Sequence, residues 1–207
     1  MGERLSSDAR LRASCLPSDK AEIPPMRLRS SLALLTALLA NSAFASPAPA
    51  ALAPLLGTIE ERLAIADQVA LSKWDSGKPV EDRQREREVI AGAVALAPAY
   101  KLSNEAVEQF FSAQIEANKL VQYAHLSDWH AQGKAPDDPR PDLVGQIRPQ
   151  LDQLQKRLLQ QLADFSPYRN DPQCPSWLAK ANKTGTQVSL RELAKVRASA
   201  ELCSASR

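Results

Sequence analysis

The stretch that decides the fold is residues 52–74, LAPLLGTIEERLAIADQVALSKW. Its apolar residues recur at steps of three and four, which is the period of one face of an α-helix. We therefore expect a long amphipathic helix that ends near Trp74, followed at 75–79 by a short loop or a kink. The residues that keep the helical period are Leu52, Leu55, Leu56, Ile59, Leu63, Ala66 and Ala70.

The same period continues along the rest of the chain. A second helix is expected at 82–96, and a third begins after a cap at Ser103 or Asn104. Residues 133–141 contain three prolines and indicate a linker. A fourth long helix follows the linker, and a fifth is expected at 191–202. The apolar face of the third helix consists of Val107, Phe110, Phe111, Ile115 and Val121, and that of the fourth consists of Val144, Ile147, Leu151, Leu154, Leu158 and Leu162.

The predicted fold class is all-α, a bundle of long helices. Residues 46–135 would supply the core helices, and 136–207 would form a C-terminal helical region that completes the bundle. A composition of 44% hydrophobic and 24% charged residues is ordinary for a folded domain. Only 7 glycines and 5% aromatic residues argue against a turn-rich β-sandwich or barrel.

Residues 26–45 have the pattern of a cleaved secretory signal. A short basic start is followed by about ten apolar residues and by Ala43-Phe44-Ala45 before Ser46, which has the small-x-small form of a cleavage site. That run is too short to span a bilayer, which takes ~20 apolar residues, and the alternative is a buried N-terminal core helix. We expect Met26 to be the true start, 1–25 to be an over-long reading frame, and the mature protein to be periplasmic or secreted.

Removal of residues 1–45 makes the chain electrically neutral. That segment holds six of the 26 basic and four of the 24 acidic residues, which leaves 20 of each. The mature chain therefore has no electrostatic footprint for nucleic acid or for an anionic membrane. Cys15 is also removed, and the remaining pair, Cys174 and Cys203, is most simply a disulfide in an exported protein.

Polar residues interrupt the apolar helix faces. Arg62 lies inside the apolar arc of the first helix, and Lys73, eleven residues later, points the same way. Taken alone, such an arginine usually extends to water, and a glutamine in such a place is usually a structural amide. The others are Asp82, Arg85 and Glu86 on the second helix, Gln114, Asn118 and Gln122 on the third, and Arg148 on the fourth.

Together these residues indicate a binding site. Four inward cations against two inward carboxylates leave an excess of positive charge, and uncompensated buried charge is costly. A small dianionic ligand in the bundle core would resolve that cost, because ligand sites in bundles are built from facing helices. The cations are Arg62, Lys73, Arg85 and Arg148, and the carboxylates are Asp82 and Glu86.

The residues on these helices resemble those of the all-helical chorismate mutases. The resemblance is specific across about residues 52–130 and weaker through 143–165. The signal, the chain length and the cysteine pair are similar to the secreted subclass. The motifs that carry it are Arg62-Leu63, Val69-Ala70, Lys73-Trp74, Pro79-Val80-Glu81-Asp82, Arg85, Phe110-Phe111, Gln114-Ile115, Ala117, Lys119 and Gln122.

The resemblance implies a Claisen rearrangement of chorismate, a dicarboxylate, to prephenate, with no cofactor or metal. Arg62 and Arg148 would clamp carboxylates, with Arg85 assisting them or orienting neighbours. Lys73 and Gln122 would donate hydrogen bonds to the breaking ether oxygen. Asp82 would lie in a turn near a substrate carboxylate, Glu86 would meet the ring hydroxyl, and Asn118 stands where the family more often has Ser or Thr. The resemblance also implies a homodimer.

Other chemistries find less support in the sequence. His125 and His130 are five residues apart and so do not share a helix face, which makes a metal site improbable, and both are expected at the surface. Trp74, Trp129 and Trp177 are expected to be core anchors. The alternative to an enzyme is an exported helical-bundle protein that binds a small dianion without turnover.

Overall fold

Every regular element that the computed structural model describes, over residues 46–183 and 188–204, is helical. The predicted all-α class is therefore confirmed, whereas the predicted signal at 26–45 and residues 1–25 lie outside the described residues. The α-helices are α1 (Leu52–Ser76), α2 (Arg83–Leu96), α3 (Asn104–Gln132), α4 (Arg148–Phe165), α5 (Cys174–Ala181) and α6 (Leu190–Ser199). The short elements are η1 (Ala97–Tyr100), η2 (Leu143–Ile147), η3 (Ser166–Tyr168) and η4 (Ala200–Leu202).

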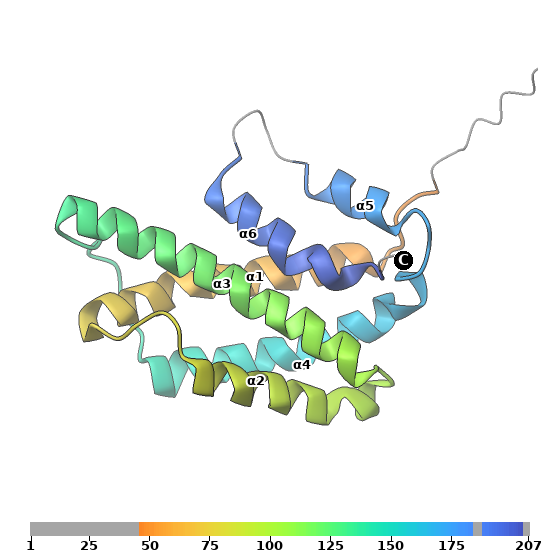
Figure 1. The fold of residues 1–207 in the computed structure, drawn as a ribbon, viewed down its shortest axis with the longest axis horizontal. Coiled ribbons are helices and arrows are strands. Elements are labelled where there is room, and N and C mark those ends of the chain that lie inside the picture. The colour runs from red at the N-terminus through yellow and green to blue at the C-terminus, as the bar shows by residue number, and fades with distance from the viewer. Residues whose placement is uncertain (1–45, 184–187, 205–207) are drawn as a thin grey trace, which may run out of the picture. The chain divides into compact units, whose positions relative to one another are not determined.

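The long helix α3 lies at the centre of the bundle (Figure 1). It packs against α1, α2 and α6, and α1 packs in turn against α4 and α6. The apolar faces predicted for the first and third helices are buried throughout. Phe110 and Phe111 meet edge to face at the core, with their ring centroids 5.3 Å apart. The three- and four-residue periodicity thus identified the faces that hold the bundle together.

Capping residues set the ends of the helices that surround the core. Helix α1 ends at Gly77, whose φ of 63° is left-handed and favours glycine. Residues 77–82 are therefore a loop, and α1 has no kink there. Asp82 caps α2 by accepting a hydrogen bond from the Arg85 N–H, and Ser103 caps α3 in the same way.

The first turn of the fourth predicted helix is not α-helical, although its apolar pattern predicted an α-helix there. Residues 143–147 form a π-helical turn, and Val144, predicted on the apolar face, is 62% exposed. Pro149 explains the wider turn, because in a regular α-helix its ring would clash with the carbonyl of Gly145. The wider turn carries Val144 away from the face on which Ile147 is fully buried.

The C-terminal region contains one helix more than the sequence predicted. The helix predicted at 191–202 is α6 followed by η4, but α5 was not predicted. A disulfide between Cys174 and Cys203 joins the start of α5 to the end of η4, which confirms that pairing. Helix α6 packs closely on α3 through small residues, among them Ala194 and Ala198, which are fully buried.

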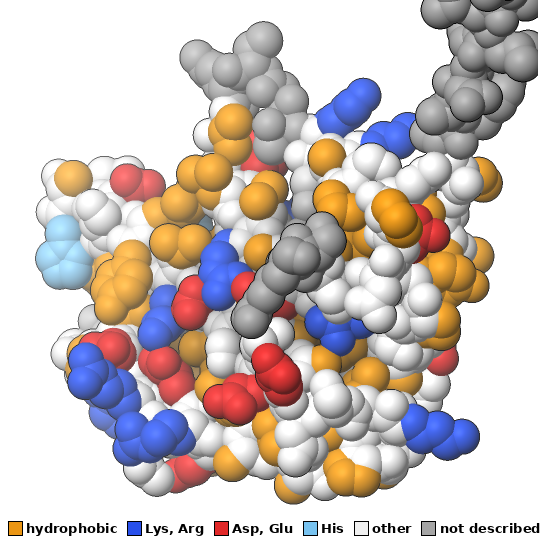
Figure 2. All heavy atoms as spheres, turned by 45° about the vertical axis from the view of Figure 1, so that its right-hand side comes forward, with side chains coloured by type: hydrophobic (Ala, Val, Ile, Leu, Met, Phe, Trp, Pro, Cys, Tyr) orange, Lys and Arg blue, Asp and Glu red, His pale blue; other side chains and the backbone are white. Residues whose placement is uncertain are grey.

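The burial of the tryptophans and histidines agrees only in part with what the sequence predicted. Trp129 and Trp177 are buried as predicted, but Trp74 is only half-buried. His130 is exposed as predicted, whereas His125 is half-buried and contacts Asp67 through a 2.8 Å bond. Basic and acidic side chains are interspersed on the face that Figure 2 shows. No helix in the described ranges is long and apolar enough to cross a membrane.

Candidate active site

All eight predicted site residues line one pocket. Helix α1 contributes Arg62 and Lys73 to it, and helix α3 contributes Asn118 and Gln122. Residues up to 86 positions apart in the sequence, Arg62 and Arg148, thus line the same pocket. The remaining four are Asp82, Arg85, Glu86 and Arg148.

The pocket has an excess of positive charge. Its lining carries five cations and three carboxylates, so two positive charges are left over. Two carboxylates of a small ligand would balance this excess. The cations are Arg62, Lys73, Arg85, Lys119 and Arg148, and the carboxylates are Asp82, Glu86 and Asp152; the apolar lining is Val69, Val80, Val89, Ile115, Leu143 and Leu151.

Arg62 is the most deeply buried of the charged residues at the pocket. Its side chain comes from the middle of α1, and the residue is only 7% exposed. Its Nη1 donates a hydrogen bond to the backbone carbonyl of Gln114 at 2.9 Å, which uses one of five N–H donors. Burial lowers the pKa of Arg62 to about 10. The guanidinium is still charged at neutral pH and can bind a carboxylate.

Lys73 presents an ammonium group to the same pocket about three helical turns after Arg62. Burial is the main cause that lowers its pKa, and the neighbouring charges of Lys78 and Arg148 lower it further. Asp82 and Glu86 act in the opposite direction. A partly desolvated amine between like charges gains from an incoming anion or a developing negative charge.

Two buried amides on α3 form a directed chain of hydrogen bonds. Gln122 Nε2 donates to Asn118 Oδ1 at 2.6 Å, and Asn118 Nδ2 donates to the backbone carbonyl of Arg62 at 3.4 Å. A carbonyl can only accept, so it fixes which end of each amide faces which neighbour. Gln122 Nε2 keeps a second hydrogen that can be donated to a ligand.

Gln114 does not join this row, although the sequence placed it there. It is fully buried, and its Nε2 donates to the Ala198 carbonyl of α6 at 2.7 Å. The three residues are spaced by four, and a helix turns by slightly more than one turn over that spacing. Gln114 consequently faces α6 and is a structural amide, while Asn118 and Gln122 face the pocket.

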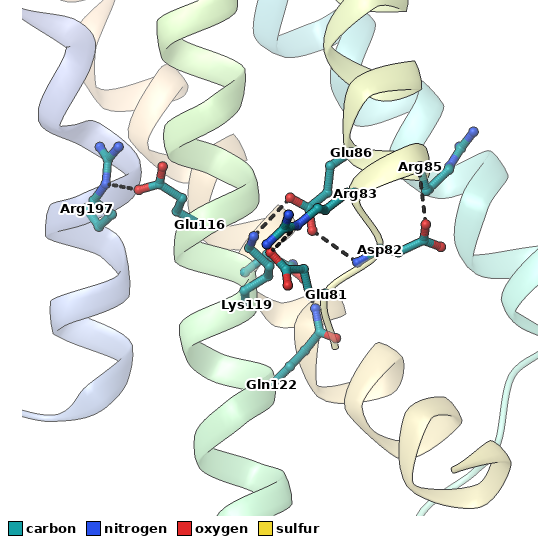
Figure 3. Close-up of polar contacts among 10 residues, drawn as sticks. Glu81, Asp82, Arg83, Arg85, Glu86, Glu116, Lys119, Gln122 and Arg197 are labelled. Carbon is teal, nitrogen blue, oxygen red and sulfur yellow. Dashed lines mark hydrogen bonds and ion pairs between the residues drawn. The ribbon is translucent and has the colours of Figure 1, made fainter. Parts of the chain in front are cut away.

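The start of α2 closes one side of the pocket. The carboxylate of Asp82 caps the helix and also lines the pocket, but the residue is exposed and so is less enclosed than the sequence predicted. Glu86 accepts hydrogen bonds from the Asp82 N–H at 3.2 Å and from Lys119 Nζ at 2.9 Å (Figure 3). Arg85 is also more open than predicted, with its side chain 37% exposed and 3.6 Å from Glu88.

Three polar residues of the lining were not among the site residues that the sequence predicted. Asp152 and Gln155 follow Arg148 at four and seven positions along α4, so helical spacing could have identified them. Lys119 was part of the motif that carries the resemblance. Its contact with Glu86 joins α3 to α2, and a periodicity within one helix does not reveal such a contact.

Comparison with known proteins gives a consistent result. Residues 53–123 match the family model chorismate mutase type II. The chain is 31% identical over 130 residues to the secreted chorismate mutase of Mycolicibacterium smegmatis, which covers 63% of this chain and 71% of that protein. It is 34% identical over 106 residues to the secreted chorismate mutase of Yersinia pestis, which covers 51% of this chain and 56% of that protein.

A solved structure supports the same assignment. The chorismate mutase from Burkholderia phymatum aligns with a TM-score of 0.69 and 43% identity, over 75% of this chain and 97% of that one. The fold and the pocket define an all-helical protein whose core contains a pocket with an excess of positive charge. With these similarities, the chain belongs to the chorismate mutase family, in its helical, secreted group.

Proposed function

We propose that this pocket converts chorismate to prephenate, so that the protein is an isomerase. One observation carries the proposal: four helices aim charged and amide side chains into one pocket that has two unbalanced positive charges. Chorismate carries two carboxylates, and its rearrangement breaks one C–O bond and forms one C–C bond within the same molecule. The reaction therefore needs no nucleophile, and the residues present supply what it does need, which is orientation and charge stabilisation.

We assign the orientation of the substrate to two arginines of the pocket lining. Arg62 and Arg148 would each bind a substrate carboxylate through the two parallel N–H groups of a guanidinium. Arg62 is suited to this because its bond to the Gln114 carbonyl holds the side chain in place. Holding both carboxylates brings the enolpyruvyl arm over the ring, which removes much of the entropic part of the barrier.

We assign stabilisation of the transition state to Lys73 and Gln122. Negative charge grows on the ether oxygen as the C–O bond breaks, and donors already in place lower the barrier because they need not reorganise. Lys73 would supply a charged donor, and Gln122 would supply the second hydrogen of Nε2. The bond between Gln122 and Asn118 supports this role, because it leaves the amide no freedom to present its oxygen instead.

The remaining residues would complete the enclosure. Glu86 would accept a hydrogen bond from the ring hydroxyl, and Arg85 would orient neighbouring groups at the open side. Asp82 would act through the turn that it caps. For Asn118 we propose orientation of Gln122 in addition to any contact with the substrate.

A direct assay separates this proposal from the alternative, a protein that binds a dianion without turnover. Purified protein is added in catalytic amount to chorismate, the ultraviolet absorbance is followed, and the product is identified by NMR. Loss of many equivalents of chorismate with formation of prephenate supports the enzyme. Stoichiometric binding without loss of chorismate would favour the binding protein.

Export and assembly extend the proposal. Relatives named as secreted support a periplasmic or secreted location for this chain. N-terminal sequencing of the exported protein should give a start at or near Ser46. A homodimer is proposed from the family alone, and light scattering of the mature protein measures it directly.

A further inference from the structure

Lys119 makes a contact that joins two walls of the pocket. It follows Asn118 on α3, and its Nζ lies 2.9 Å from Oε2 of Glu86 on α2. The two side chains are 21% and 23% exposed, which makes this pair one of the more shielded ion pairs of the described chain. Both residues also line the pocket, so the pair is part of the surface that a ligand would meet (Figure 3).

The other oxygen of the same carboxylate is held from its own helix. Glu86 Oε1 accepts the backbone N–H of Asp82 at 3.2 Å, and the side chain of Asp82 is itself held by the Arg85 N–H at 3.1 Å. The carboxylate of Glu86 is thus fixed at both oxygens, from α2 and from α3. An ionised carboxylate has about four acceptor positions, so two bonds still leave it able to accept another.

We propose that Lys119 is a positioning residue that holds the carboxylate of Glu86 in the orientation in which it accepts a hydrogen bond from the ring hydroxyl of the substrate. The inference rests on the proposed function and goes beyond it, because it assigns a role to a side chain that acts through Glu86. Charge-assisted hydrogen bonds are the stronger class, and this one is shielded from water on two sides by helices. Without its cation the carboxylate would be free to turn toward solvent, and it would then lose its place as an acceptor.

A second ion pair on α3 provides the matched control. Glu116 lies three residues before Lys119 and contacts Arg197 of α6 at 2.7 Å, with side chains that are 52% and 30% exposed. Neither residue of this pair lines the pocket. Loss of Glu116 therefore removes an interhelical ion pair of α3 while it leaves Glu86 and its partners intact.

Three variants test the role with chorismate as the substrate. Lys119→Met should lower kcat/KM by about ten- to hundredfold, as expected for loss of a hydrogen bond to a charged group. Lys119→Arg should restore most of the activity because it keeps the cation. Glu116→Gln should leave kcat/KM unchanged. In the Glu86→Gln background, Lys119→Met should have almost no further effect, because the carboxylate on which it acts is already gone.

A substrate analogue makes the test specific. When the ring hydroxyl of chorismate is replaced by hydrogen, wild type and Lys119→Met should react at equal rates, because the analogue has no hydroxyl to donate a hydrogen bond to Glu86. An equal loss with chorismate and with the analogue would overturn the inference, since Lys119 would then act on folding or on a substrate carboxylate. Unchanged kcat/KM in Lys119→Met would overturn it as well. Absence of chorismate turnover in the wild type would instead refute the proposed function itself.

Discussion

Gln122 and Asn118 are hydrogen-bonded within α3, from Nε2 to Oδ1, at 2.6 Å. The bond is buried, and the chain ends on the backbone carbonyl of Arg62 in α1. The backbone position of Arg62, which we propose binds substrate, is therefore connected to the orientation of Gln122, which we propose donates to the ether oxygen. The amide of Asn118 accepts from Gln122 at its oxygen and donates to α1 from its nitrogen, so this one side chain links the two residues.

This relationship predicts the effect of Asn118→Leu, which keeps the branched shape of the side chain and removes both polar ends. Gln122 would lose the acceptor that orients it, so kcat should fall by about ten- to hundredfold with a smaller change in KM. Gln114→Leu is the control on the same helix, since it loses its bond to Ala198 away from the pocket and should lower the melting temperature with kcat retained. Equal kcat in Asn118→Leu and wild type would show that the hydrogen bond from Gln122 to Asn118 does not contribute to catalysis.

The second prediction concerns pH. A glutamine donates through its amide at any ordinary pH, whereas a glutamate donates only when it is protonated. Gln122→Glu should therefore lose turnover at neutral pH and recover as the pH falls, although Lys73 nearby favours the ionised carboxylate. The measurement is a pH–rate profile of both proteins, with folding checked at each pH. Superimposable profiles would mean that Gln122 is only a structural amide.

The third prediction uses the pKa of Lys73, which burial lowers in the folded protein. The unfolded chain then binds more protons than the folded one between the lowered pKa and 10.5, so stability rises with pH across that window. Below the window the full cost of the buried charge is present. Lys73→Met should accordingly be more stable than wild type at pH 7, with the difference shrinking as the pH approaches 10.5.

Urea unfolding at several pH values measures this difference. Lys78→Met provides the control, because Lys78 is exposed in the loop that follows α1. Its free energy of unfolding should stay close to that of wild type. A Lys73→Met protein that is less stable than wild type at pH 7 would show that contacts of the ammonium outweigh its desolvation.

The fourth prediction concerns the disulfide. Cys174 and Cys203 are 29 residues apart, and on the chain-entropy model a loop of that size contributes roughly 3–4 kcal/mol. The double variant Cys174→Ser/Cys203→Ser should unfold at a lower temperature. Its turnover at 25 °C should be retained, because the pocket lining ends at Gln155. Loss of activity well below the melting temperature would place the C-terminal region in catalysis.

Helical periodicity alone predicted much of this molecule. The turn of about 100° per residue fixes the face on which each side chain lies, so Arg62, Lys73 and Gln122 could be assigned to one interior from spacing. The pocket that contains all eight predicted residues follows from the same regularity. Capping also acts locally, which is why the ends of α1 and α3 were close to prediction.

The features that the sequence did not predict are too short to show a period, depend on one local residue, or depend on contacts between elements. Helix α5 has only eight residues, which is too few for a period to be recognised. The turn before α4 depends on Pro149, and the facing of Gln114 depends on α6, which is more than 70 residues away. Lys119 belongs to the same class, because its role depends on Glu86 of another helix.

The central claim is that donors in this pocket stabilise the transition state of chorismate rearrangement, and turnover by Lys73→Met tests it most directly. This variant is expected to be well folded, so a loss of rate reports chemistry. We predict that wild type and Lys78→Met convert chorismate to prephenate at similar rates, and that Lys73→Met loses about 10²–10³-fold in kcat, as for one preorganised donor. Wild-type kcat in a folded Lys73→Met protein would contradict the account.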